Sequence, residues 1–235
     1  MDKFVIEGQR PLRVVVQVSG SKNAVLPILA AGLLTREPLI LQNCPNLWDV
    51  RSMLRILSEL GVSGERAENG TITLQIQSET PDTAPYELVK TMRASFCVLG
   101  PLLAKRGKAK VSLPGGCVIG PRPVDLHLKG LAALGARIEV ENGYVIATAT
   151  KLKGAEIYLA GASGSSVLAT ANVVTAAVLA EGRSSIVNAA TEPEIQDLMH
   201  CLNKMGAKIT GIGTPVVQIQ GVDELHGATH EVIPD

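Results

Sequence analysis

The sequence predicts a protein of the α/β (α+β) class: one domain with pseudo-threefold symmetry, in which helices are buried and sheets lie outside. Two observations lead to this prediction. One pattern of helices and strands occurs three times along the chain, and each copy begins with a stretch that is apolar on every side. With 235 residues, of which 46% are hydrophobic, the chain is large enough to bury such a core.

Each copy of the pattern ends in the same way. An amphipathic helix is closed by a glycine, at Gly61, Gly135 or Gly206, and two short alternating strands follow. In the first two copies the strands meet at Asn69-Gly70 and Asn142-Gly143, a dipeptide favoured in tight hairpins of type I′. The closing glycines lie roughly 70 residues apart, so we interpret the three segments as copies of one unit.

The similarity extends to the residues ahead of each amphipathic helix. The segments LPILAAGLLTREPLILQN, ASFCVLGPLLAKRGKAKVSLP and TANVVTAAVLAEGRSSIVNAA each indicate an apolar helix, a charged turn and a strand. A helix without a polar face belongs inside a protein, and strands with one polar face can cover it. Three units of helix, strand, helix and hairpin therefore fill about residues 22 to 221. Residues 1 to 21 hold two further predicted strands outside the repeat, and residues 222 to 235 also lie outside it.

Composition argues against several classes of protein. Lys and Arg together number 22, as do Asp and Glu, so the formal net charge is zero and we expect no nucleic-acid or membrane partner. No apolar run reaches the ~20 residues of a membrane span, and the first residues lack the apolar core of a secretory signal. Neither the four cysteines nor the four histidines show metal-binding spacing. We expect Cys44, Cys97 and Cys201 to be free thiols of the core in a reducing cytoplasm.

The middle copy of the unit carries about five extra residues, which fall within LPGGCVIGPRP. A loop lengthened in one copy only points to function, because the fold forms twice without it. Cys117 lies in this loop behind two glycines, and Arg122 can favour a thiolate there or bind an anion. The alternative is a surface cysteine in a flexible loop.

Lys22 and Asn23 open the first apolar helix behind Ser19-Gly20-Ser21. The first turn of a helix carries unpaired N–H groups and the positive end of the helix dipole, so this position suits a phosphate or a carboxylate. Arg93 and Ser165-Ser166 stand at the equivalent points of the other two apolar helices. The three helix starts are thus candidates for one anion site. The alternative is that each is only a polar helix start, with Ser21 as a simple N-cap.

Several of these segments carry a family resemblance. SGSKNAVLPIL, LVKTMRAS, VSLPGGCVIGPRPVDLHLKGLAALGA, ATEPEIQDL and the final VIPD closely resemble the enolpyruvyl transferase family, in its UDP-N-acetylglucosamine branch, and the resemblance runs over the whole chain. It implies an inside-out α/β barrel of three repeats that is joined to a second such barrel. Residues 22–229 would form one barrel, residues 1–21 would belong to the second, and residues 230–235 would begin the crossover to it.

The resemblance also implies site residues. Lys22 and Asn23 match contacts to phosphoenolpyruvate. Cys117 matches the loop cysteine that acts as the catalytic proton donor and forms a thioether with phosphoenolpyruvate. The residues that match contacts to UDP-N-acetylglucosamine are Arg93, Arg122, Pro123, Val124, Asp125, Leu126, Gly164, Ser165, Ser166 and Val167. Within GSSVLATAN, Leu168 replaces a glycine of the family and a few residues are added ahead of it.

The implied reaction transfers the enolpyruvyl (1-carboxyvinyl) group of phosphoenolpyruvate to the 3′-hydroxyl of UDP-N-acetylglucosamine. It proceeds by addition and then elimination of phosphate, without a cofactor, and begins peptidoglycan precursor synthesis in the cytoplasm. Members of the family are considerably longer than this chain, so activity is expected to need the C-terminal half of the same enzyme. Two alternatives stay open. One is a truncated half that binds nucleotide-sugar without turnover, and the other is a transferase of the 5-enolpyruvylshikimate-3-phosphate synthase type.

Overall fold

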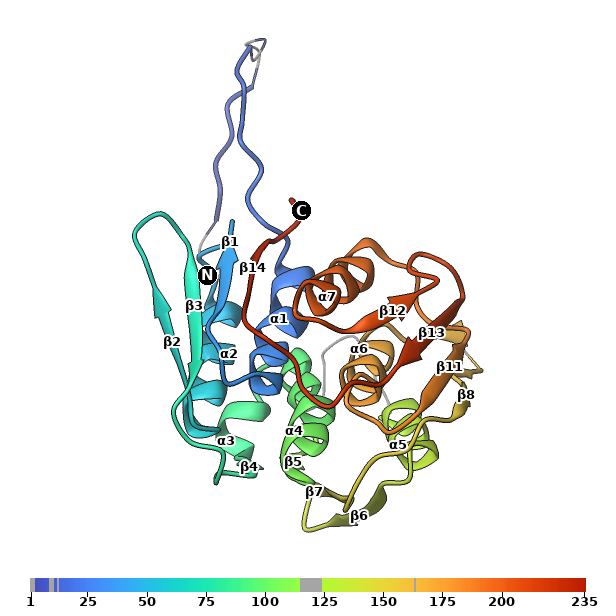
Figure 1. The fold of residues 1–235 in the computed structure, drawn as a ribbon. Helices are drawn as coiled ribbons and strands as arrows, with labels where there is room; N and C mark the ends of the chain where they lie inside the picture. The colour runs from blue at the N-terminus through green and yellow to red at the C-terminus, as the bar shows by residue number, and fades with distance from the viewer. Residues whose placement is uncertain (1–2, 9–10, 12, 115–123, 163) are drawn as a thin grey trace.

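The computed structural model describes residues 3–8, 11, 13–114, 124–162 and 164–235. In this part of the chain, three four-stranded sheets lie around a group of central helices (Figure 1). The first sheet contains β1 (Leu39–Gln42), β2 (Val62–Arg66), β3 (Ile72–Ile76) and β14 (Ala228–Glu231). The second contains β4 (Thr83–Ala84), β5 (Lys108–Ser112), β6 (Arg137–Glu141) and β7 (Tyr144–Thr148). The third contains β8 (Glu156–Tyr158), β11 (Arg183–Val187), β12 (Lys208–Thr210) and β13 (Val216–Gln220).

All three sheets follow one plan. The strand orders are β14-β1-β3-β2, β4-β5-β7-β6 and β8-β11-β13-β12. In each order the first pair is parallel and the other two pairs are antiparallel. The sheets stay separate among the described residues, so their strands do not form one closed barrel. A small fourth sheet pairs β9 (Ala160–Gly161) with β10 (Gly164–Ser165).

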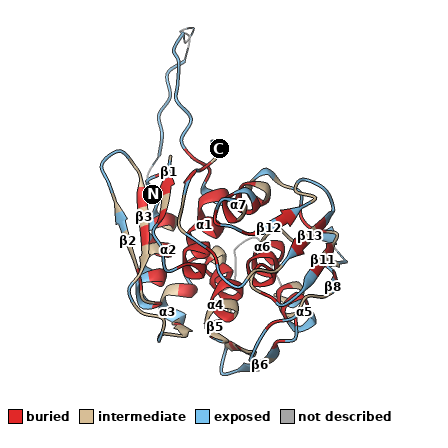
Figure 2. Ribbon diagram, viewed as in Figure 1, coloured by how far each residue is buried: buried red, intermediate tan, exposed pale blue. Residues whose placement is uncertain are grey.

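The helices divide into central and covering ones. The central group contains α1 (Lys22–Ala31), η1 (Gly32–Leu34), η2 (Arg93–Val98), α4 (Leu99–Arg106) and α6 (Val167–Ala177). The others are α2 (Trp48–Glu59), α3 (Tyr86–Val89), α5 (Asp125–Ala133) and α7 (Pro193–Lys204). Every residue of 24–31 in α1 and of 169–177 in α6 is buried, as Figure 2 shows in red. The prediction of buried apolar helices is confirmed, and the cause is that these helices have no polar face to offer to water.

The three predicted closing glycines end their helices as expected. Gly61, Gly135 and Gly206 have φ angles of 77°, 91° and 102°, which a residue without Cβ adopts without strain. Asn142 and Gly143 also have positive φ, at 50° and 77°, as a type I′ hairpin turn requires.

The corresponding prediction for Asn69-Gly70 is wrong. Of the two residues only Gly70 has a positive φ, and the connection between β2 and β3 is longer than two residues. The Ala67 N–H donates to the Thr71 carbonyl at 2.8 Å, and the Thr71 N–H donates to Asn69 Oδ1 at 3.0 Å. The asparagine side chain therefore supports a wider loop instead of occupying a tight turn.

The first residues differ most from expectation. The two strands predicted within residues 1 to 21 are not found in the described part of that segment, which extends away from the body of the molecule (Figure 1). Val14, Val15 and Val16 are more than two-thirds exposed, so these β-prone residues have no strand to pair with in this structure. Among the described residues of this segment, Gly20 alone forms a bridge, which is antiparallel to Pro234.

At the other end of the chain, β14 crosses the border predicted at residue 229. It runs to Glu231 because it pairs in parallel with β1, with Leu41 opposite His230. His230 Nε2 also lies 2.9 Å from Asp197 Oδ1 of α7, and both side chains are buried. Residues 230 and 231 thus belong to the first sheet.

Candidate functional site

The starts of three central helices, α1, η2 and α6, meet at one cavity. Its volume is about 350 Å³. The first turn of α1, the start of η2 and the start of α6 all contribute to its wall. The lining residues are Lys22, Asn23, Leu26, Asp49, Met92, Arg93, Ala94, Val167, Leu168 and Glu194. A helix start offers unpaired N–H groups and the positive end of the helix dipole, so a cavity lined by three such starts suits an anion.

Lys22 is the first residue of α1, and its ammonium is held beside a carboxylate. Lys22 Nζ lies 3.3 Å from Asp49 Oδ2, with 45% of the lysine side chain and 28% of the aspartate side chain exposed. Ser21 does not cap α1 with its side chain, contrary to the simple alternative. Its hydroxyl donates instead to Asp235 Oδ1 at 2.9 Å. Lys22 and Asn23 therefore stand at an open helix start that faces the cavity.

The predicted serine segment leads into α6. Ser166 is the N-cap, and its hydroxyl accepts a hydrogen bond from the Ala169 N–H at 3.4 Å. Gly164 and Ser165 form β10 and pair with Gly161 and Ala160 of β9. Val167 follows directly and lines the cavity, whereas Gly164, Ser165 and Ser166 do not.

The predicted uridine segment is described only in its second part. Val124 is the N-cap of α5, and Asp125 and Leu126 form its first turn. A Cβ atom on Gly161 would lie 3.7 Å from Leu126 Cδ1, so Leu126 lies beside the β9–β10 hairpin. Cys117, Arg122 and Pro123 lie outside the described residues.

His127 is a buried histidine whose pKa is affected by the charge of Arg93. His127, on the first turn of α5, is only 1% exposed. Burial lowers its pKa to about 3, and the positive charge of Arg93 adds to the shift. Its Nδ1 lies 2.8 Å from Asn172 Nδ2. An amide nitrogen can only donate, so His127 accepts at Nδ1 and carries its proton on Nε2.

The sequence interpretation missed two carboxylates of the cavity, Asp49 and Glu194. Each lies in the first turn of an amphipathic helix, Asp49 in α2 and Glu194 in α7. Acidic residues are common there because they favour the helix dipole, so the pattern alone did not mark them as site residues. Together they balance the charges of Lys22 and Arg93, so the described wall of the cavity has no net charge.

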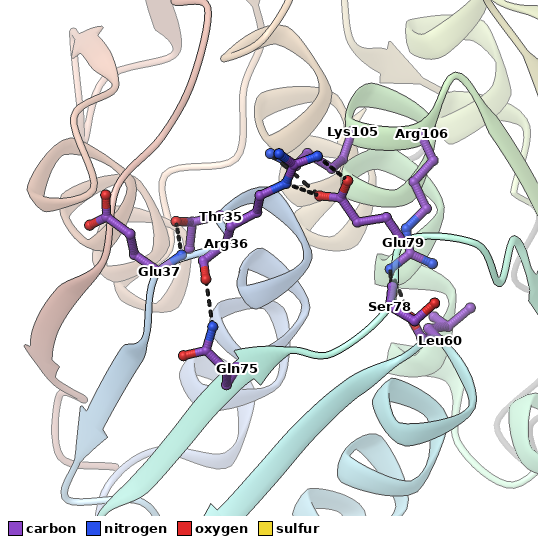
Figure 3. Close-up of polar contacts among 9 residues, drawn as sticks. All are labelled: Thr35, Arg36, Glu37, Leu60, Gln75, Ser78, Glu79, Lys105 and Arg106. Atoms are coloured by element: carbon purple, nitrogen blue, oxygen red, sulfur yellow. Dashed lines mark hydrogen bonds and ion pairs between the residues drawn. The ribbon is translucent and has the colours of Figure 1, made fainter.

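A second cavity, of about 440 Å³, lies at the other ends of the central helices. Two of its arginines are bound by neighbouring protein groups (Figure 3). The Arg36 guanidinium binds both oxygens of Glu79, at 3.1 and 2.7 Å. Arg106 donates to the backbone carbonyls of Leu60 and Ser78, at 2.7 and 3.2 Å. These contacts join the segment around residues 78 and 79 to Arg36 and to the end of α4. We therefore assign this cavity a structural role.

The described residues offer neither a metal site nor a membrane-spanning helix. No group of three or more His, Cys, Asp or Glu side chains in the described ranges is placed to hold a metal ion. Among the helices that the structure describes, none is both long and apolar enough to cross a bilayer.

Comparisons with known proteins agree with one another. The family model described as EPSP synthase (3-phosphoshikimate 1-carboxyvinyltransferase) matches residues 6–235. A UDP-N-acetylglucosamine 1-carboxyvinyltransferase of Hydrogenovibrio crunogenus is 53% identical over the whole chain, which covers 56% of that relative's length. The chain therefore spans about half the length of this curated relative.

Solved structures share the fold. The enolpyruvyl transferase NikO of Streptomyces tendae matches with a TM-score of 0.81 and 21% identity, over 97% of this chain and 53% of its own. An EPSP synthase of Acinetobacter baumannii matches with a TM-score of 0.71 and 20% identity, over 94% of this chain and 49% of its own. At these identities the likeness concerns the fold alone.

Proposed function

Since the chain belongs to the EPSP synthase family of carboxyvinyltransferases, we propose that it forms one wall of an enolpyruvyl transferase site. Its substrates are phosphoenolpyruvate and UDP-N-acetylglucosamine. The observation that carries the proposal is the cavity into which α1, η2 and α6 direct their first residues, among them Lys22, Asn23 and Arg93. Identity of 53% to a UDP-N-acetylglucosamine 1-carboxyvinyltransferase over the entire chain supports this choice of acceptor.

In the proposed site, charge and hydrogen-bond donors hold the anionic substrates. Lys22 and Asn23 bind phosphoenolpyruvate, helped by the dipole of α1. Arg93 binds the nucleotide-sugar, together with Arg122 to Leu126 and the segment Gly164 to Val167. Lys22 and Arg93 are balanced by Asp49 and Glu194, so tight binding of two polyanions needs further cations. Arg122 and the remainder of a longer enzyme are the proposed sources.

The proposed reaction is an addition followed by an elimination. The 3′-hydroxyl of the sugar attacks C2 of phosphoenolpyruvate and loses its proton, while Cys117 donates a proton to C3. The tetrahedral ketal then loses phosphate from C2 and a proton from C3, which leaves the enolpyruvyl ether. Bonds and charges balance without a redox or metal cofactor, and the chemistry depends on positioned acids, bases and cations.

We also propose the architecture that the repeat predicts. Residues 22–229, extended by residues 230 and 231 of β14, form an inside-out barrel of three units with pseudo-threefold symmetry, which the common plan of the three sheets supports. Residues 1–21 and 232–235 connect to a second barrel of the same enzyme. The exposed apolar side chains of Phe4, Ile6 and Val15 support this, because a covering partner would remove them from water.

The proposed setting is the first committed step of peptidoglycan precursor synthesis in the cytoplasm. Two other functions compete with it. A shikimate-type transferase shares the family model, but its solved representative is only 20% identical to this chain. The second alternative is a truncated half of the enzyme that binds nucleotide-sugar in the same cavity but does not catalyse the transfer.

One experiment separates the three functions. Calorimetric titration with UDP-N-acetylglucosamine and, separately, with shikimate 3-phosphate identifies the acceptor. Phosphate release from phosphoenolpyruvate is then measured with and without an added C-terminal half of the homologous enzyme. We expect binding of UDP-N-acetylglucosamine only, and phosphate release only with the added half. Binding of shikimate 3-phosphate alone would overturn the proposed acceptor, and absence of turnover with the half present would favour the binding module.

A further inference from the structure

The carboxamide of Asn172 joins three helices at one buried point. Asn172 lies in α6 and is fully buried. Its Oδ1 accepts a hydrogen bond from the Gly100 N–H of α4 at 2.7 Å. Its Nδ2 donates to the Phe96 carbonyl of η2 at 2.9 Å and to Nδ1 of His127 at 2.8 Å. One amide can make these bonds at the same time, because it has two N–H donors and an acceptor oxygen.

The two backbone groups bound by Asn172 are a matched pair. Residues 96 and 100 are the carbonyl and N–H partners that an uninterrupted α-helix would join. At this point the chain changes from the 3-10 helix η2 to the α-helix α4. Asn172 thus supplies a hydrogen-bonding partner to each side of the junction. This junction belongs to the helix that begins with Arg93.

Close contacts at two glycines fix the same crossing point. A Cβ atom on Gly100 would lie 2.2 Å from the Asn172 backbone oxygen. A Cβ atom on Gly130 of α5 would lie 2.2 Å from Val173 Cγ2. Both α4 and α5 therefore approach α6 at residues 172 and 173, which leaves little freedom for them to shift.

We propose that Asn172 is a positioning residue of the nucleotide-sugar site: it fixes the Arg93 helix and the first turn of α5 relative to each other and holds His127 as the neutral Nε2–H tautomer. The inference rests on the proposed function, because Arg93 and the segment Val124 to Leu126 are there assigned to one ligand. Asn172 does not line the substrate cavity and acts only through these elements.

The electrostatics give the arrangement a measurable signature. Burial lowers the pKa of His127, and the positive charge of Arg93 lowers it further, so both disfavour the imidazolium form. The substitution Asn172→Asp keeps the shape and an acceptor for Gly100 but removes both donors. A carboxylate beside Nδ1 favours a proton on that nitrogen, so the substitution stabilises the imidazolium form of His127.

The test combines nuclear magnetic resonance of the imidazole with calorimetric titration of UDP-N-acetylglucosamine. In the unmodified chain we expect no titration of His127 between about pH 5 and 8, and in Asn172→Asp a titration within that range. We expect affinity for UDP-N-acetylglucosamine to fall about tenfold in Asn172→Asp. The matched control is Thr175→Val, since Thr175 is buried in the same helix and its hydroxyl donates to the Ala171 and Asn172 carbonyls of that helix. It should change affinity by less than about twofold.

Unchanged affinity and an unchanged His127 in Asn172→Asp would overturn the proposal. If the unmodified chain binds no nucleotide-sugar, the proposed function fails, and the titration of His127 alone decides whether Asn172 sets its tautomer. If Asn172→Asp does not fold, His127→Leu and His127→Gln replace it. Glutamine keeps an acceptor for Asn172 and leucine does not, so leucine should weaken binding more, and equal affinities would contradict the positioning role.

Discussion

Cys117 is expected to react with alkylating reagents before the other three cysteines. Burial raises the pKa of Cys44 to about 11 and the pKa of Cys97 and Cys201 to about 12. Those thiols are almost fully protonated near neutral pH, and the thiolate is the reactive form. Limited treatment with iodoacetamide followed by peptide mapping should label Cys117 first, and Cys117→Ser should remove the fast phase. Faster labelling of Cys44, Cys97 or Cys201 would refute this expectation.

His127 is expected to make the fold less stable in mild acid. Its pKa is lowered from 6.5 to about 3, so the unfolded chain binds a proton at this site below pH 6.5 while the folded chain does not. The contribution of His127 to the free energy of unfolding is therefore fully present above pH 6.5, the pKa in the unfolded chain. It decreases as the pH falls from there toward about 3, the pKa in the folded chain. Between about pH 7 and 5 the loss is about 2 kcal/mol.

The measurement is urea unfolding at several pH values, on the unmodified chain and on His127→Gln. Glutamine has no proton to gain, so the variant should show a flatter dependence of unfolding free energy on pH. Parallel curves for the two proteins would show that His127 does not stay neutral in the folded state.

At the scale of elements, Gly130 is expected to tolerate no side chain. A glycine to alanine change inside a helix is normally stabilising, by about 0.5 to 1 kcal/mol. Here the added Cβ would lie 2.2 Å from Val173 Cγ2, so α5 and α6 must separate. Gly130→Ala should therefore destabilise the fold by about 1 to 3 kcal/mol in urea unfolding. Ala132→Ser, an exposed position of α5, serves as the control. A stabilised Gly130→Ala would show that the two helices do not cross as closely.

The elements differ in how far the sequence could predict them. The buried helices α1 and α6 followed from uninterrupted apolar residues, and the closing glycines followed from the end of each amphipathic pattern. The loop around Asn69 could not be predicted in this way. The dipeptide Asn-Gly occurs in tight turns and also in wider loops that the asparagine side chain supports. In the cavity, Lys22 and Arg93 were predictable from their place at helix starts, whereas Asp49 resembles any acidic first-turn residue until the fold brings it beside Lys22.

At the scale of the whole molecule, the extended first residues are expected to exchange their amide protons rapidly. Val14, Val15 and Val16 are exposed and belong to no strand in the described structure. Hydrogen exchange should thus show no protection there, against strong protection in α1 and α6. Addition of a C-terminal half of the homologous enzyme should protect them, because the proposed second barrel pairs with this segment. Strong protection of these valines in the chain alone would place the domain border elsewhere.

The starts of α1, η2 and α6 form the proposed substrate site, and the most direct test of it is the affinity of Arg93→Ala for UDP-N-acetylglucosamine. Trp48 is the single tryptophan and is exposed beside Asp49, which lines the cavity, so its fluorescence can follow the titration. Lys204→Ala, in the last turn of α7, is the control for loss of a positive charge. We expect Arg93→Ala to weaken binding about tenfold or more, as loss of a charge-assisted contact does, and Lys204→Ala to bind like the unmodified chain. Equal affinities for the two variants would contradict it.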